Sequence, residues 1–497
     1  MKLFTAWQMQ HWDAYTIKHQ QISSLELMER ASQACTDWII QQNFANRNIK
    51  IFCGKGNNGG DGLAIARQLL TNGTGAVVYI AAFGATGTPD FQQNLARLRS
   101  LTTDIHYLQS AEQFPAINEE DIVIDALFGF GLNRPLTGLY QQLVEHINNY
   151  AKQVIAIDVP SGLFTDETSN NNTIIKATYT LTFQSLKLCF VAAENAAYFG
   201  EVIVLPIGLE NKYEDDETAI YEMVSEEMIV NLYKPRKAFS HKGTYGHALL
   251  IAGNTGKMGA AVMCAKACLR SGVGLLTCAI PREEFAVLQT TTAEAMVINR
   301  KEIPDISKYD AIGIGPGLGT ADEMITLLLN VVERYKQPML LDADALNIIA
   351  RHTDLLQLLP KHAIITPHPK EFDRLFGESS NDFERMQKAI DASVQYNIII
   401  VLKGHYTLIA NEGKGYFNTT GNAGMATGGS GDILSGIITA LLAQQYSPFG
   451  AAILGVYVHG LAGDWCLEEQ SYESLLPTDM VEKLGKAFKQ ISNKKEA

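Results

Sequence analysis

Two glycine-rich stretches carry the side chains best suited to chemistry in this sequence. The first, Gly54–Gly62, reads Gly-Lys-Gly-Asn-Asn-Gly-Gly-Asp-Gly, and the second, Gly421–Asp432, ends in Gly-Ser-Gly-Asp. Each stretch is followed by a helix-like apolar run, at 63–70 and at 433–442. Glycines that open a helix aim unpaired backbone amides and the positive end of the helix at an anion. Both stretches therefore predict phosphate-binding loops.

The first stretch contains the spacing G-x-G-x-x-G, which is typical of nicotinamide-coenzyme dehydrogenases. Such a site also requires an acidic residue roughly 20 residues further on, at the end of the second strand, to hold the ribose hydroxyls. The apolar run at 76–83 ends without Asp or Glu. The motif is therefore weak evidence for hydride transfer, and Asn57, Asn58 and Asp61 need another explanation.

Polar side chains also follow apolar runs further along the first half of the chain, where strands are expected to end. Asp125 ends one run, Asp158 ends another and leads into Val-Pro-Ser161, and the glycine loop 129–135 follows Asp125. A single Asp at a strand end more often caps a helix or closes a turn. Gathered on one sheet edge, however, Asn, Asp and Ser oxygens suit a hard cation and glycine amides suit phosphate. A remaining carboxylate could then act as acid or base.

Asp432 stands at the start of the helix predicted after the second glycine stretch. We interpret Asp432 as a base that takes a proton from a hydroxyl while loop amides stabilise a transferring phosphoryl group. A plain helix N-cap is the alternative. Two roles are open for His368, a substrate contact or a loop hydrogen bond, and two for Asp342 and Asp344, magnesium binding or a turn cap. His459, on an apolar helix-like stretch, is interpreted as a core histidine.

The elements that must position these residues fall into two series. Apolar strand candidates alternate with helical stretches from about residue 50 to residue 207, and a second such series begins at 248. This alternation predicts parallel sheets covered by helices, and 497 residues exceed the usual size of one hydrophobic core. The charged segment 210–238 is poor in apolar runs. We predict an α/β domain at 1–210, a linker at 211–224 and a second α/β domain at 225–497.

Composition excludes several other classes of protein. The formal charge of -13 argues against nonspecific nucleic-acid binding. Seven cysteines without regular spacing do not indicate a disulfide framework, and we expect buried thiols. No apolar run approaches the roughly 20 residues of a membrane span, and the N-terminus lacks a signal-peptide core. We expect a cytoplasmic protein that binds neither membranes nor nucleic acid.

Three motifs in the first series together resemble the NAD(P)H-hydrate epimerase domain: Gly54–Gly62, Asp125–Pro135 and Ala156–Gly162. The resemblance covers most of residues 1–210 and implies a Rossmann-like three-layer fold, with Asp158 as the acid/base near carbon 6 of the hydrated nicotinamide. It implies a potassium ion held by Asn58, Asp125 and Ser161. It implies substrate binding by Asn57, Asn58, Gly59, Gly60, Asp61, Gly129, Phe130, Gly131, Leu132, Asn133, Arg134 and Pro135. The sequence departs from the family pattern at 166–170 and 183–187, outside these residues.

Gly-Ser-Gly-Asp432 resembles the anion-hole motif of ribokinase-like kinases, and further motifs narrow the resemblance to the ADP- or ATP-dependent NAD(P)H-hydrate dehydratase family. Over about residues 225–490 these motifs are Ser240–Gly246, Gly253–Ala261, Gly315–Gly319, Leu341–Leu346, Thr366–Pro369 and Lys403–Thr407. The resemblance implies a ribokinase-like α/β domain with Asp432 as the catalytic base. Nucleotide contacts are expected from Lys403, Gly404, His405, Tyr406, Thr407 and Gly431, and substrate contacts from Ala260, Gly317 and His368. Lys370 replaces a commoner glycine.

The two resemblances imply one bifunctional enzyme that repairs hydrated NADH and NADPH. The first domain would equilibrate the epimers at carbon 6. The second would phosphorylate the S epimer and release NAD(P)H, phosphate and AMP or ADP. Potassium, magnesium and ADP or ATP are the expected cofactors, and a homo-oligomer is the expected assembly. A ribokinase-like vitamin-alcohol kinase and a noncatalytic first domain are the alternatives.

Overall fold

The structure is a computed structural model that describes residues 1–44, 47–83, 86–303 and 305–496. The chain divides into two compact units. The first unit comprises residues 2–219 with 381–383, and the second comprises residue 1, residues 220–380 and residues from 384 onward. The segment expected as a linker contains helix α7 (Asn211–Asp216) and strand β9 (Tyr221–Met223). Because the two units fold around separate sheets, each is described by itself.

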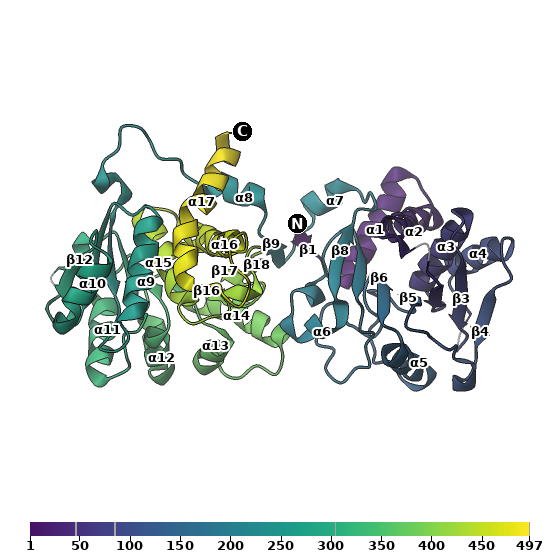
Figure 1. Cartoon of the computed structure of the whole chain (residues 1–497). Coiled ribbons are helices and arrows are strands. Elements are labelled where there is room, and N and C mark those ends of the chain that lie inside the picture. Colours follow the sequence, from purple (N-terminus) through teal and green to yellow (C-terminus); the bar gives the residue numbers. More distant parts are fainter. Residues whose placement is uncertain (45–46, 84–85, 304, 497) are drawn as a thin grey trace. The chain divides into compact units, whose positions relative to one another are not determined.

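The first unit is built on a seven-stranded sheet with the order β4-β3-β2-β5-β6-β7-β8, in which each neighbouring pair is parallel (Figure 1). The strands are β2 (Ile49–Cys53), β3 (Ala76–Ala81), β4 (Ile105–Leu108), β5 (Ile122–Ala126), β6 (Gln153–Ile157), β7 (Tyr179–Phe183) and β8 (Glu201–Leu205). Strand candidates near all of these except β4 were expected from the sequence. The sequence did not predict β4, because this strand is only partly buried, with His106 and Tyr107 exposed.

Helices cover both faces of this sheet, which makes three layers. The helices are α1 (Ala6–Gln20), α2 (Ser24–Gln41), α3 (Asn57–Thr71), α4 (Pro89–Arg99), α5 (Gly138–Tyr150) and α6 (Ala196–Phe199). Successive side chains of a strand point to opposite faces. In β2, Ile51 and Cys53 accordingly join a buried cluster with α1–α4, whereas Phe52 joins a cluster with α5. The predicted Rossmann-like three-layer fold is confirmed.

The strand order reverses between β2 and β5, since α3 leads from β2 to β3 on one side while β5 pairs with β2 on the other. Ligands of open α/β sheets bind beyond the carboxyl ends of the strands at such a switch point. Gly54, directly after β2, donates its amide to Ala126 O at 2.9 Å. A Cβ on Gly54 would stand 2.0 Å from Leu127 O, and one on Gly59 would stand 1.9 Å from Gly54 O. The glycines therefore let the loops after β2 and β5 approach closely.

The second unit contains a mostly parallel sheet. Its strands follow the order β9-β18-β17-β16-β15-β14-β13-β10-β11-β12, and β17 is antiparallel to both of its neighbours. The strands are β10 (His247–Ile251), β11 (Leu275–Ile280), β12 (Met296–Asn299), β13 (Ala311–Ile314), β14 (Leu340–Leu341), β15 (Ile364–Ile365), β16 (Ile399–Leu402), β17 (Leu408–Asn411) and β18 (Lys414–Phe417). The second α/β fold predicted from the sequence is thus present.

The core of the second unit is organised around α15, whose middle and end are almost wholly buried. Gly436 allows its close approach to α9, because a Cβ there would lie 2.2 Å from Cys264 O. The helices are α8 (Glu226–Leu232), α9 (Met258–Arg270), α10 (Phe285–Thr291), α11 (Asp322–Arg334), α12 (Asp344–Arg351), α13 (Pro369–Phe376), α14 (Asp382–Tyr396), α15 (Ser430–Ala443), α16 (Pro448–Cys466) and α17 (Pro477–Glu496). This packing fixes the N-terminus of α15, which carries the Gly-Ser-Gly-Asp motif.

Two expectations from composition concern the whole chain. The seven cysteines are all buried and free, as expected. Across the described ranges, no helix combines the length and apolarity that crossing a membrane requires.

Gly54→Ala should destabilise the first unit. The added Cβ would overlap Leu127 O, so the two loops must separate or the strand must shift. Overpacking of this kind costs about 1–3 kcal/mol, which thermal unfolding should register as a lower midpoint. Gly56→Ala is the matched control, because a Cβ at Gly56 meets nothing within 4 Å. Equal stability of the two variants would contradict the close approach.

Candidate active sites

A cavity of about 670 Å³ in the first unit is lined by the loops that follow β2, β5 and β6. The expected site residues that line it are Asn57, Asn58, Asp61, Gly129, Phe130, Gly131, Leu132, Asn133, Arg134 and Asp158. Gly59 and Gly60 lie in the first turn of α3 without lining the cavity, and Pro135 directly follows the lining loop. The structure therefore brings most of the expected substrate residues together.

Asp158 is held in place by a buried lysine. Its backbone has a φ of +67°, a conformation that is uncommon outside glycine and that clusters at functional sites. Lys187 Nζ donates to Asp158 Oδ1 at 2.7 Å, and the two side chains are 1% and 4% exposed. Lys187 also donates to Thr182 Oγ1 at 2.7 Å and to Phe183 O at 2.9 Å. A buried carboxylate needs such a partner, and Lys187 supplies the compensating charge.

The residues expected to hold potassium lie at the ends of β5 and β6. Ser161 donates to both oxygens of Asp125, through Oγ at 2.6 Å and through its amide at 2.8 Å. Burial raises the pKa of Asp125 to about 6, and the bonds from Ser161 oppose this rise. Asn58 Nδ2 donates to Ile157 O at 2.8 Å, while Asn58 Oδ1 is buried and has no hydrogen-bond donor in the part of the chain that is described. An orphaned amide oxygen and a buried carboxylate are a donor set that suits a hard cation.

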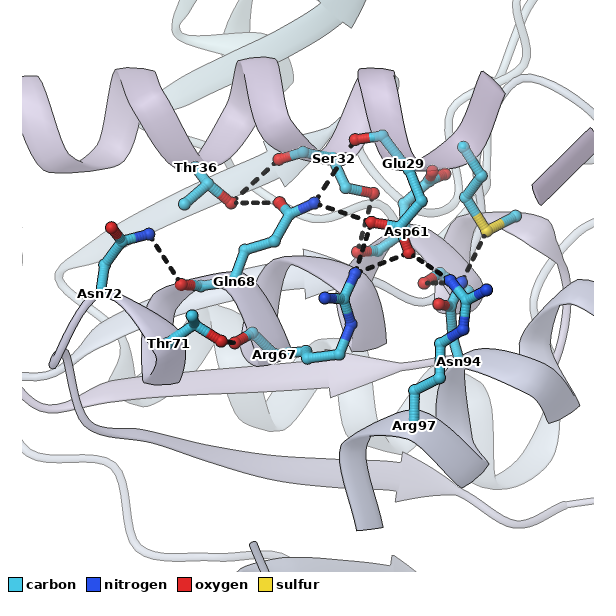
Figure 2. Close-up of polar contacts among 12 residues, drawn as sticks. Glu29, Ser32, Thr36, Asp61, Arg67, Gln68, Thr71, Asn72, Asn94 and Arg97 are labelled. Carbon is cyan, nitrogen blue, oxygen red and sulfur yellow. Dashed lines mark hydrogen bonds and ion pairs between the residues drawn. The ribbon is translucent and has the colours of Figure 1, made fainter. Parts of the chain in front are cut away.

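Polar contacts brace the helix that carries the first glycine motif (Figure 2). Glu29 of α2 accepts a hydrogen bond from Arg67 of α3 at 2.6 Å and from Arg97 of α4 at 2.8 Å. Thr36 Oγ1 of α2 donates to Gln68 Oε1 of α3 at 2.9 Å. These contacts tie α2 to both α3 and α4. The asparagines in the first turn of α3 are therefore presented from a fixed helix rather than from a free loop.

Three further carboxyl groups line the cavity with Asp158: Asp13 from α1, Asp61 from α3 and Asp90 from α4. Burial and the charge of Asp158 raise the pKa of Asp13 to about 7, and they raise the pKa of Asp61 well above its usual range. Sequence reasoning identified neither Asp13 nor Lys187. A signal existed for Lys187, because a lone charge within the apolar run 186–191 is typical of a paired, buried group.

In the second unit, Asp432 lies in the first turn of α15. Gly429, with a φ of +103°, is the N-cap and supplies no side-chain hydrogen bond, so its side chain caps none of the amides of the first turn. The interpretation of Asp432 as a plain N-cap is wrong, since Gly429 occupies that position. Burial and the nearby charge of Asp342 raise the pKa of Asp432 to about 7, while Lys403 opposes the rise.

Lys403 and Asp342 form a partly buried ion pair beside Asp432. Lys403 Nζ donates to Asp342 Oδ1 at 3.0 Å, and Ser435 Oγ donates to Asp342 Oδ2 at 2.7 Å. A Cβ on Gly431 would stand 3.4 Å from Lys403 Nζ, so the lysine lies against the glycine motif. The charge of Asp342 is compensated, and Asp432 is therefore the carboxyl group left to accept a proton.

The remaining expected residues of this site lie on neighbouring loops. Gly317 meets Ala260 of α9, since a Cβ on Gly317 would stand 3.0 Å from the Cβ of Ala260. In the loop Lys403–Thr407, the Gly404 amide donates to Thr407 Oγ1 at 3.4 Å, and the rings of His405 and Tyr406 lie 4.7 Å apart. These contacts give the expected nucleotide loop a defined shape.

The histidines of the second unit make local hydrogen bonds. His368 is the N-cap of α13, with Nδ1 accepting from the amides of Lys370 and Glu371 at 3.2 Å and 3.4 Å. Of its two open roles, the loop hydrogen bond is present. His459 Nε2 lies 2.9 Å from Ser430 O, and burial lowers the pKa of His459 to about 4. A neutral His459 thus helps to fix the first residue of α15.

Asp344 makes local polar contacts. It accepts a hydrogen bond from the Gly319 amide at 2.8 Å, and Lys257 Nζ lies 3.6 Å from it.

Comparison with known protein families gives a match in each of the two units. Residues 24–189 match the profile of the family described as YjeF-related protein N-terminus, and residues 248–486 match that of NAD(P)H-hydrate dehydratase. A bifunctional NAD(P)H-hydrate repair enzyme from Moorella thermoacetica is 34% identical over 100% of this chain and 98% of its own length. One from Escherichia coli is 35% identical over 92% of this chain and 88% of its own length.

A solved structure supports the fold of the second unit. A ribokinase-like superfamily protein from Enterococcus faecalis is 30% identical, covers 55% of this chain and 98% of its own, and has a TM-score of 0.51. The second unit is thus a ribokinase-like α/β domain with an aspartate at a helix N-terminus, fused to a Rossmann-like domain with an acidic cavity. The chain belongs to the family of bifunctional NAD(P)H-hydrate repair enzymes, and the resemblance drawn from its motifs is confirmed.

Lys187→Met should strongly destabilise the first unit, because Asp158 would be left buried without a partner. Breaking a buried pair in this way costs about 3–5 kcal/mol, which thermal unfolding can measure. Lys152→Met is the control: Lys152 Nζ lies 3.8 Å from Glu119 at the surface, and its loss should change stability by no more than about 0.5 kcal/mol. The double variant Lys187→Met/Asp158→Asn should recover much of the loss. Stability of Lys187→Met equal to that of the control would exclude the buried pair.

Proposed function

We propose that this chain repairs hydrated NADH and NADPH in two steps, epimerisation in the first unit and nucleotide-dependent dehydration in the second. The main support for this proposal is the similarity to bifunctional repair enzymes over the whole chain, because that similarity includes both candidate sites in the same order along the sequence. The full match also disfavours a vitamin-alcohol kinase, which would need only a ribokinase-like unit.

In the epimerase, Asp158 is the acid/base group that acts at carbon 6 of the hydrated nicotinamide. Its buried pairing with Lys187 fixes the carboxylate, and the cavity that it lines has room for a nicotinamide ring with its ribose. The unpaired amides at the N-terminus of α3 and the loop 129–135 hold the coenzyme's anionic groups. Because these groups sit on strand ends and a braced helix, the substrate is oriented before proton transfer.

Asn58, Asp125 and Ser161 hold a potassium ion in this proposal. The support is the orphaned Asn58 Oδ1 together with the buried Asp125 carboxylate, whose charge has no cationic partner among the described residues. A bound cation supplies fixed positive charge for the coenzyme's anionic groups. Asn58 then links the cation site to the first turn of α3.

In the dehydratase, Asp432 takes the proton from the carbon-6 hydroxyl while that oxygen forms a bond to the terminal phosphorus of ADP or ATP, and the bond from this phosphorus to the bridging oxygen breaks to release AMP or ADP. The amides at the start of α15 stabilise the charge on the transferring group. Phosphate then leaves from the ring carbon, and loss of a proton from the adjacent carbon restores the double bond of the dihydronicotinamide. Lys403–Thr407 and Gly431 hold the nucleotide, and Ala260, Gly317 and His368 contact the hydrated ring. Magnesium, when bound, neutralises the nucleotide's phosphates.

The direct test uses an epimeric mixture of hydrated NADH with magnesium and either ADP or ATP, and follows the near-ultraviolet absorbance of NADH. We expect full recovery with the natural chain. Asp158→Asn should stop recovery at the share present as the S epimer, and Asp432→Asn should slow dehydration by about 10²–10⁴-fold. A stable phosphorylated product in place of released phosphate would contradict the dehydratase.

The potassium proposal has a readout that is independent of activity. At constant ionic strength, replacing tetramethylammonium chloride with potassium chloride should raise the thermal midpoint of the first unit, because a ligand that binds the folded state stabilises it. Asn58→Ala should abolish this rise. Asn72→Ala, at the far end of α3, keeps the motif intact and serves as control. An identical potassium effect in Asn58→Ala would remove Asn58 from the site.

A further inference from the structure

Helix α1 forms a wall of the first cavity that none of the recognised motifs includes. The side chains of α1 that line the cavity are Gln10, Asp13, Ala14 and Ile17. Their spacing of i, i+3, i+4 and i+7 places them on one helical face. The match to the family profile begins at residue 24, so α1 lies outside it. The cavity face of α1 therefore has no assigned role.

The opposite face of α1 is anchored in the first unit. Trp12 Nε1 donates to Glu210 O at 2.9 Å, and the Glu210 amide donates to Thr16 Oγ1 at 2.9 Å. Trp12 packs edge-on against Phe4, with ring centroids 5.3 Å apart. These contacts flank Asp13 on both sides. The carboxyl of Asp13 is consequently presented to the cavity from a fixed position.

Asp13 and Asp158 share the cavity in contrasting surroundings. Asp158 Oδ1 accepts from Lys187, whereas the Asp13 carboxyl receives no hydrogen bond or ion pair from any residue that the structure describes. The charged groups that act on Asp13 are Asp158 after β6 and Lys187 after β7. The cavity lining also contains the carboxyl groups of Asp61 and Asp90 and the guanidinium of Arg134. Burial and Asp158 raise the pKa of Asp13 to about 7, and Lys187 opposes the rise. A carboxyl group without a hydrogen-bond donor beside one held by a lysine is an arrangement that suits an acid paired with a base.

Resting on the epimerase function proposed above, we propose that Asp13 is a second catalytic residue of the epimerase, the acid that complements Asp158. It transfers its proton to and from the ring nitrogen of the hydrated nicotinamide. Gln10 and Ile17 form the helical wall on either side of it.

The proton balance of this step closes without any other reactant. The Asp158 carboxylate takes the hydroxyl proton, the oxygen forms a double bond to carbon 6, and the bond from carbon 6 to the ring nitrogen breaks with its electron pair going to nitrogen. Asp13 gives its proton to that nitrogen. Rotation about the neighbouring carbon–carbon bond turns the other face of the aldehyde toward the nitrogen. Reclosure returns one proton to Asp13 and the other from Asp158 to the oxygen.

The test starts from one purified epimer of hydrated NADH, without nucleotide, and measures its conversion to the other epimer by chromatography. Asp13→Asn should lower the rate by about 10²-fold or more, and Asp13→Glu should restore part of it. Asp37→Asn, an exposed carboxylate on α2 outside the cavity, is the matched control and should leave the rate unchanged. Thermal unfolding of each variant separates loss of catalysis from loss of fold.

The pH dependence of kcat/KM gives an independent readout that a merely structural role would not move. With the natural chain, kcat/KM should fall as the pH rises through about 7, because Asp13 must carry its proton. Asp13→Asn should lose this falling limb. A limb that persists in Asp13→Asn assigns the titration to Asp61 and overturns the inference, as does an unchanged rate. Failure of the natural chain to interconvert the epimers would instead overturn the epimerase function itself.

Discussion

The buried ion pair between Lys187 and Asp158 is the constraint on which the first site depends. A carboxylate at the end of a central strand cannot lose its water without a compensating charge. Lys187 meets that need from the loop after β7, and it fills its other hydrogen bonds with Thr182 and Phe183. Because the negative charge of Asp158 is kept in the cavity, neighbouring carboxyl groups are pushed toward their protonated forms. The pair thereby sets the chemistry of Asp13 and Asp61 as well as its own.

In the second unit, too, a lysine compensates the charge of a carboxylate at the end of a strand. Lys403 after β16 compensates Asp342 after β14, and Ser435 of α15 binds the other oxygen. The residual field of Asp342, together with burial, raises the pKa of Asp432. In both units a lysine compensates the charge of one carboxylate, and burial together with that carboxylate raises the pKa of a neighbouring carboxyl group.

The sequence predicted those parts of the sites that lie within short stretches of the chain. Gly-Ser-Gly-Asp432 and the loops after β2, β5 and β6 could be placed because a strand, a turn and a helix follow one another within a few residues. Lys187 and Asp13 could not be identified from the sequence. Their contacts join β6 to β7 and α1 to the sheet across long stretches of chain.

Fusion of the two activities follows from their stereochemistry. Removal of water through a phosphorylated intermediate requires the hydroxyl to lie toward both Asp432 and the nucleotide, and a site with fixed walls can satisfy this for one configuration of the ring carbon. The walls here are fixed, since Gly317 and Ala260 are in contact and α15 is buried along its length. If damage yields both configurations, the dehydratase would repair one epimer of the hydrated coenzyme. The other epimer would therefore accumulate unless a second site interconverted the two. That second site needs no nucleotide, and the cavity of the first unit gathers its carboxyl groups from strand ends and covering helices.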